Sequence, residues 1–403
     1  MRCVQSYRSC TGPSGVDGSI KHCHLHARRA QLSVSAKTAC PGVRSIVPQP
    51  VAPPGAFVAL KPAHSYPRFA PNLLNLVSVA PERLASFLHI VAQTEAQCPA
   101  EGLFYLEKCY VYEGKHVLSE AGDWLPSSVT DLGIADQLRA TILGVARDGH
   151  VLPLEKHADP TVIIAKAGSS NYGHVFAEML PKLMTLKRLG LPRFRLLLPA
   201  DMDFVTAVIV DVVRALGLVV DIRMFGPAEL VQAAAVYVMS PMSQHDSRKS
   251  TTFLELRSLL AHAYGCKYER NRRFLITRGG RDSRKLVGAE QVEAIFGRHG
   301  FEPIHPLSLS IPDQIRLFSS ASHIAGALGA GLSNIAFAPE GCEVLMMDPG
   351  LGDFFFWDFS CLVKQRFTWL FTGRFQGYSE ALAASDFAID EQILDVNLRS
   401  VYG

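Results

Sequence analysis

The sequence predicts an α/β protein with two doubly wound parallel sheets and a small β-rich module ahead of them. Its 403 residues exceed one average domain, and 48% hydrophobic with 19% charged residues is typical of a globular chain with a sizeable core. From residue 159 onward, short apolar runs alternate with amphipathic stretches, which is the pattern of a parallel sheet covered by helices. These observations exclude a disordered, collagen-like or coiled-coil protein.

Residues 1–50 form a basic extension that we expect to be disordered. They contain seven Lys and Arg against one acidic residue, Asp17, and lack both an apolar period and the hydrophobic segment of a secretory signal. His22, Cys23, His24 and His26 could hold a metal ion, but adjacent ligands without a distant partner pair rarely complete a tetrahedral site. A solvated tail is the simpler interpretation.

Residues 51–158 are expected to form the β-rich module. The run Leu103–Tyr112 is rich in aromatic and apolar side chains, Glu113 and Gly114 follow as a turn, and His116–Leu118 returns as a second strand. The segment therefore predicts a hairpin.

Strands and helices alternate after residue 159, and a basic segment near 265–273 divides them. Four strands precede this segment and four follow, so we expect Rossmann-like domains at 159–265 and 266–403 that face a cleft. Two helices end at Gly190 and Gly300, where a C-cap glycine is expected. The expected strands are 161–166, 194–199, 219–224, 234–239, 274–277, 302–305, 323–327 and 343–347. The expected helices are 175–189, 204–216, 251–264, 289–299 and 311–321.

Cysteine usage and hydropathy indicate the compartment. Nine cysteines are an odd number, and they contain no Cys-x-x-Cys pair, which favours a reducing, cytoplasmic environment over a disulfide framework. The most apolar stretch, 204–220, is interrupted by Asp211 and Arg214, so no membrane span is predicted.

A histidine and a glutamate lie at the start of the helix expected at 175–189. His174 and Glu178 are four residues apart, which places them on one face of its first turns. The helix N-terminus disfavours the protonated ring and the carboxylate can orient it, so the pair is a candidate general base for a hydroxyl. In the alternative, which spacing alone favours, His174 only completes the loop and Glu178 pairs with Lys182.

A second candidate site is a basic cluster around the strand expected at 274–277. Guanidinium groups at the carboxyl end of a strand suit a diphosphate, because they donate paired hydrogen bonds to its oxygens. Nucleic acid is the rival ligand. However, the net charge of the chain is +3, and the first 50 residues contribute +6, so the remaining residues carry −3. The loop also has no interleaved aromatic side chains. We therefore favour a small anion. The basic residues are Lys267, Arg270, Arg272, Arg273, Arg278, Arg281, Arg284 and Lys285.

A glycine-rich turn follows the strand expected at 323–327. Gly326, Gly329 and Gly331 would let backbone N–H groups approach a phosphate at the start of a short helix. Their spacing matches neither the dinucleotide fingerprint nor a P-loop, so a dehydrogenase or an NTPase is not predicted. A tight turn that needs glycine only for packing is the alternative.

Three motifs, in this order, resemble glycosyltransferase family 61. The combination is more specific than any single motif, and the resemblance covers roughly residues 103–372. The motifs are Asn171-Tyr172-Gly173-His174 with Glu178 and Pro181, then Ile276-Thr277-Arg278 with Arg284 and Leu286, then Gly329-Ala330-Gly331-Leu332-Ser333-Asn334 with Pro339 and Gly341.

The resemblance implies a GT-B-like pair of Rossmann-type domains, with the acceptor bound by the first and the donor by the second. It implies inverting transfer from a nucleotide diphosphate sugar, first of all a UDP-sugar, to a hydroxyl of a glycan or lipid-linked saccharide in surface or capsular polysaccharide synthesis. No nucleic-acid partner is expected, and peripheral contact with a membrane stays open. The implied catalytic residues are His174 and Glu178, and the implied donor-binding residues are Arg278, Arg284, Gly329, Ala330, Gly331 and Asn334.

Two positions depart from the family pattern. Leu328 stands where histidine is usual, and Val175 where tryptophan is usual. Because Leu328 removes a donor contact, the alternative function is a nucleotide-sugar-binding or glycan-binding protein with impaired catalysis.

No metal or other cofactor is expected. Asp201 and Asp203 match the Asp-x-Asp pattern by which other glycosyltransferases hold a metal, but they stand just before an expected helix, where capping is the ordinary role of Asp. The aromatic run Phe354–Trp357 is likewise interpreted as packing rather than as a platform for a sugar.

Overall fold

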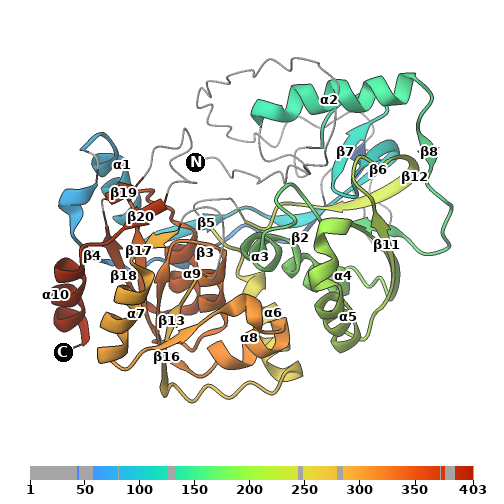
Figure 1. The fold of residues 1–403 in the computed structure, drawn as a ribbon. Coiled ribbons are helices and arrows are strands. Elements are labelled where there is room, and N and C mark those ends of the chain that lie inside the picture. The colour runs from blue at the N-terminus through green and yellow to red at the C-terminus, as the bar shows by residue number, and fades with distance from the viewer. Residues whose placement is uncertain are drawn as a thin grey trace, which may run out of the picture.

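The computed structural model has a mixed α/β fold with two main sheets, which lie beside each other in Figure 1. The described residues are 43–44, 58–79, 81–125, 132–243, 248–278, 285–372, 374–376 and 386–402. The expected α/β class with parallel strands is confirmed.

The first sheet combines a parallel centre with an antiparallel extension. Strands β12, β9, β10 and β11 run parallel in that spatial order, and β12 pairs antiparallel with the long strand β6. The predicted hairpin is confirmed, because β7 returns onto β6 after Gly114, whose φ of 67° is a conformation that suits glycine. The strands are β1 (Val43–Arg44), β2 (Val58–Lys61), β6 (Glu101–Tyr112), β7 (His116–Ser119), β8 (Leu152–Pro153), β9 (Thr161–Ile163), β10 (Arg193–Pro199), β11 (Val219–Phe225) and β12 (Leu230–Met239).

Helices cover the first sheet because alternate strand residues turn apolar side chains to each face. Val162 and Leu196 pack with Leu183 and Ile209 of the helices that follow β9 and β10. Ile142, from a helix that precedes β9, packs with side chains of β7 and β12. The helices are α2 (Leu132–Arg147), α3 (Tyr172–His174), the π-helix η3 (Val175–Met179), α4 (Pro181–Arg188), the 3₁₀-helix η4 (Ala200–Val205) and α5 (Thr206–Ala215).

The second sheet has six strands, all parallel, in the order β15-β13-β16-β17-β18-β4. Helices α7 and α10 pack on one face, and α8, η6 and α9 pack on the other. The strands are β4 (Asn72–Leu74), β13 (Arg272–Ile276), β15 (Glu302–Ile304), β16 (Ala321–Ala327), β17 (Glu343–Asp348) and β18 (Arg366–Phe371). The helices are α7 (Ala289–Arg298), α8 (Ile311–Phe318), η6 (Ala330–Phe337), α9 (Phe355–Val363) and α10 (Glu391–Tyr402).

One hydrophobic core joins the two sheets. Leu196 of the first sheet and Val344 of the second belong to the same buried cluster, and α6 (Thr252–Ala263) packs against helices of both halves. The Arg257 side chain of α6 also donates hydrogen bonds of 3.0 and 2.7 Å to the carbonyls of Ala336 and Ala338. The halves are therefore held in contact by packing as well as by hydrogen bonds.

The strands of the predicted module at 51–158 do not form one separate sheet. β6 belongs to the first sheet and β4 to the second, while β3 and β5 pair with each other. Of the predicted extension at 1–50 the structure describes Val43–Arg44, which pair with β6, and the rest lies outside the described residues. The remaining short elements are η1 (Leu76–Ser78), α1 (Pro81–Val91), β3 (His64–Pro67), β5 (Glu95–Cys98), β14 (Leu286–Val287), η5 (Pro306–Ser308), β19 (Arg374–Gln376) and β20 (Asp386–Ala388). Within the described ranges, no helix has the length and apolarity that a membrane span needs.

Candidate active site

The helical segment after β9 contains one widened turn. Asn171 caps its start, because its side-chain oxygen accepts a hydrogen bond of 2.9 Å from the Gly173 N–H. Leu180 donates to the carbonyl of Val175, five residues back, as in a π-helix. Pro181 has no N–H for the Ala177 carbonyl, which instead accepts a hydrogen bond of 2.9 Å from Ser243. The sequence pattern predicted the helix but not this turn.

His174 and Glu178 contact each other in this segment. A third residue, Lys166, joins them, and it was not predicted from the sequence. His174 Nδ1 lies 3.1 Å from Glu178 Oε1, and the other carboxylate oxygen forms an ion pair with Lys166, just beyond β9. The exposed fractions are 6% for His174, 1% for Glu178 and 5% for Lys166. The three side chains form a buried charge network.

The network keeps Glu178 ionised. Burial would raise the pKa of this carboxyl, but the Lys166 ion pair and the His174 hydrogen bond outweigh burial and hold the pKa well below its usual range. A carboxylate accepts hydrogen bonds only, so Nδ1 of His174 is the donor in this pair. The second ring nitrogen, Nε2, is then the one that can accept a proton.

Lys182 does not pair with Glu178, so the alternative interpretation of this helix face is wrong in that detail. Its Nζ donates a hydrogen bond of 2.8 Å to the carbonyl of Ile164. Burial, together with the nearby Lys166, lowers the pKa of Lys182 to about 7. Lys182 thus ties the helix to the end of β9.

The glycine turn after β16 lies against Arg278. A Cβ at Gly329 would overlap the Arg278 guanidinium, and one at Gly331 would lie 3.2 Å from a methyl carbon of Ile276. The structure thus brings Arg278, just beyond β13, onto the turn. Ala330 begins η6 on the same turn.

The first and third motifs are in direct contact. Tyr172 donates a hydrogen bond of 2.8 Å to the side-chain oxygen of Asn334, whose NH₂ group donates to Gln314 and to the Gly331 carbonyl, both at 3.0 Å. A Cβ at Gly173 would lie 2.5 Å from Ser333 Oγ, so the close approach requires glycine. Asn334 is fully buried, and in this structure its amide links the two halves.

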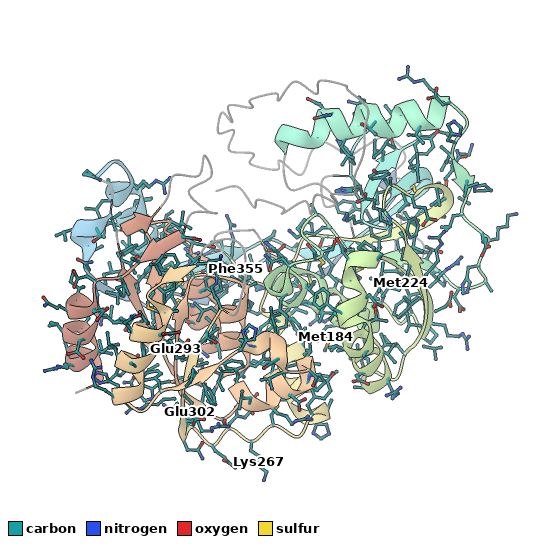
Figure 2. All side chains as sticks on the ribbon, viewed as in Figure 1. Met184, Met224, Lys267, Glu293, Glu302 and Phe355 are labelled. Atoms are coloured by element: carbon teal, nitrogen blue, oxygen red, sulfur yellow. The ribbon has the colours of Figure 1, made fainter. Side chains whose placement is uncertain are left out.

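An aromatic side chain completes this junction. The ring of Phe355, labelled at the centre of Figure 2, lies edge-on to His174 with a centroid distance of 5.9 Å. Phe355, Phe356 and Trp357 are buried, so the aromatic run serves packing, as expected.

A cavity of about 190 Å³ lies at the carboxyl ends of three strands of the second sheet. Its lining includes Arg278, just beyond β13, Lys285, just before β14, and Glu293 of α7. Glu293 was not predicted from the sequence, because a single acidic residue on a helix carries no signal of its own. Arg284 and the rest of the loop at 279–284 lie outside the described residues.

Asp201 is not a helix cap, so that part of the prediction is wrong. Its carboxylate accepts a hydrogen bond of 2.7 Å from Ser169 and pairs with Lys115 at 3.3 Å, and neither η4 nor α5 has a side-chain cap. The Lys115 charge occupies one oxygen that a metal would need. Among the described residues, no three His, Cys, Asp or Glu side chains gather in a way that could hold a metal.

Part of the chain matches a known protein family. The family model described as Glycosyltransferase 61 matches residues 172–345. The matched region begins at Tyr172, ends within β17, and so contains His174, Glu178, Arg278 and the glycine turn. No curated protein matches the chain. Residues 172–345 are therefore similar to glycosyltransferase family 61, as the three motifs predicted.

Proposed function

We propose that this glycosyltransferase transfers a sugar, with inversion, from a nucleotide diphosphate sugar to a hydroxyl of a glycan or lipid-linked saccharide. The observation that carries the proposal is the contact of the His174 helix with the glycine turn through Tyr172 and Asn334. It brings a candidate base and a candidate diphosphate site to one junction. A GT-B-like division into acceptor and donor halves, a UDP-sugar as donor, and a role in surface polysaccharide synthesis are parts of the proposal.

The donor diphosphate would bind at the carboxyl ends of β13 and β16. Arg278 and Lys285 supply positive charge beside the cavity, and the turn from Gly329 to Gly331 can offer N–H groups without side-chain interference. We expect Arg284 to join them. Negative charge develops on the departing diphosphate in the transition state, so these groups would stabilise it there.

The acceptor hydroxyl would be activated by His174. Nε2 accepts the hydroxyl proton, the acceptor oxygen bonds to the anomeric carbon, and the bond to the diphosphate breaks with its electron pair leaving on the phosphate oxygen. A single displacement with the base and the leaving group on opposite sides of the anomeric carbon inverts its configuration. The intact charge network of Glu178 and Lys166 favours an active transferase over a protein that only binds the nucleotide sugar.

A transfer assay tests this proposal. The full chain would be incubated with UDP-, GDP-, CMP- and dTDP-sugars, first in a thermal-shift screen, where a ligand at 100 times its Kd stabilises by about 2.7 kcal/mol. The stabilising donor is then offered to saccharide acceptors, and the anomeric configuration of the product is read by NMR. Binding without transfer or donor hydrolysis would contradict catalysis, and a retained configuration would contradict the single displacement.

We also propose that transfer needs no divalent metal, since the cations at β13 can offset the diphosphate charge. Turnover in excess EDTA should equal that in magnesium or manganese. Activity abolished by EDTA and restored by a metal would overturn this proposal. The Asp201→Asn variant would then test whether that carboxylate is a ligand.

A further inference from the structure

We propose that Lys166 is a positioning residue, which keeps the His174–Glu178 pair unprotonated at neutral pH so that His174 can act as a base. The inference deepens the proposed function and rests on it for the role of His174. The match to the family model begins at Tyr172, so Lys166 lies outside the matched residues.

The geometry makes Lys166 the counter-ion of a buried carboxylate. Its Nζ contacts one oxygen of Glu178, while His174 contacts the other. Both ionic side chains are almost completely buried, so each would be costly to ionise without the other. The carboxylate is thus shared between the Lys166 ammonium group and a ring that can become a cation.

Removal of Lys166 would change where the pair holds a proton. Without the ammonium group, the buried carboxylate is neutralised by pairing with a protonated His174. The ring therefore takes up its proton at higher pH, and His174 is no longer available as a base at neutral pH. An opposite charge within about 4–6 Å changes the titration midpoint of a group by about 1–3 pH units.

Other charged groups around His174 are further from the carboxylate or already paired. Lys182 bonds the Ile164 carbonyl, and Asp201, beyond the Gly168 turn, pairs with Lys115. On the side of α9, Lys249 lies over the ring of Phe355, and Asp358 pairs with Arg68. Where η6 contacts this helix it presents the uncharged Ser333 and Asn334.

The test is the NMR titration of the His174 ring in the full chain, without substrates. Histidine rings are labelled with carbon-13, and the His174 signal is assigned by its loss in His174→Gln. Lys166→Met should raise the titration midpoint by about 1–3 pH units, while Lys166→Arg should stay within about 0.3 unit of the wild type. Lys182→Met is the matched control, because it also replaces a buried lysine, and it should give less than half the change.

Each outcome decides the proposal. A midpoint in Lys166→Met equal to that of the wild type would overturn it and leave Lys166 a packing residue. If Lys166→Met does not fold, Lys166→Gln should also raise the titration midpoint of His174. An unchanged midpoint in that variant would equally overturn the proposal. Because no substrate is present, the titration stands even if the proposed transfer fails.

A kinetic readout links the titration to turnover. In Lys166→Met, the acid limb of the pH profile of kcat/KM should move to higher pH by the same amount as the ring titration, with donor affinity unchanged. Activity should therefore recover as the pH is raised. A uniform loss at every pH would indicate a structural role and would contradict the proposal.

Discussion

The two halves of the candidate site are built in opposite ways. In the first half, the site consists of side chains whose charges contact one another: His174, Glu178 and Lys166 are buried and bonded within the protein. In the second half, Gly329 has no side chain, so the Arg278 guanidinium can lie directly against the backbone of the turn, beside a cavity. The first site is preorganised by charge and the second by space, so they should fail under different substitutions.

The largest effect, on kcat, is expected from substitutions of His174 and Glu178. His174→Ala should lower kcat by about 10²–10⁴-fold with donor affinity almost unchanged, because a base acts on the acceptor. Glu178→Gln should lower kcat less, since its amide can still bond the ring. Steady-state kinetics and calorimetric titration with the donor nucleotide measure both. Exposed His262 of α6 provides the control, His262→Ala, and near-normal turnover in both site variants would contradict the assignment.

Substitutions at Arg278 and the glycine turn should weaken nucleotide binding. Arg278→Ala removes charge-assisted hydrogen bonds of about 1.5–3 kcal/mol, which corresponds to roughly 10–150-fold weaker nucleotide binding. Gly329→Ala should act in the same direction, because its methyl group displaces the guanidinium. The control is Arg272→Ala at the other end of β13, where the side chain pairs with Glu302. Equal nucleotide affinity in all variants would move the phosphate site elsewhere.

The contact between the halves should be sensitive to a single methyl group. Gly173→Ala brings a carbon into Ser333 Oγ and the Phe355 ring, so it should lower the free energy of unfolding by about 1–3 kcal/mol. Gly297→Ala in α7 is the matched control, because no atom lies within 4 Å of its Cβ position. Urea unfolding compares the two. An equally stable Gly173→Ala would mean that the halves are not held together at this point.

The smallest effect concerns Lys182, the second buried lysine. Its pKa is lowered from 10.5 to about 7, first by burial and then by Lys166. The unfolded chain therefore binds more protons above pH 7, and stability should rise with pH, by about 1 kcal/mol between pH 7 and pH 8. Lys182→Met should remove this part of the rise. Identical pH dependence in both proteins, measured by urea unfolding, would show that Lys182 does not titrate there.

Local patterns predicted the elements that carry the site, but not how they pair. The pattern of apolar runs located α4, β10, β13 and β16 within a few residues, because most side chains of these elements are buried. It could not assign β4 to the edge of the second sheet, since that pairing joins distant parts of the chain. Nor could it separate η4 from α5, which differ only in hydrogen-bond pattern.

The candidate site was predictable as residue types and not as a network. The spacing of His174 and Glu178 placed them on one face, and the basic strand end suggested Arg278. Lys166 gave a usable signal, a lysine at the end of an otherwise buried strand, but its partner depends on a helix that folds back over that strand. Asp201 misled for the same reason, because Lys115 comes from a distant hairpin.

The pairing of β4 with β18 delays the packing of one part of the protein during synthesis on the ribosome. Asn75, next to β4, donates a hydrogen bond of 2.7 Å to the carbonyl of Phe371, 296 residues further along the chain. At a synthesis rate of roughly 5–20 residues per second, the segment around β4 waits about 15–60 s for its partner strand to emerge. Until then the apolar side chains around β4 have no sheet to pack on. An early-made segment of the folded chain is therefore packed late.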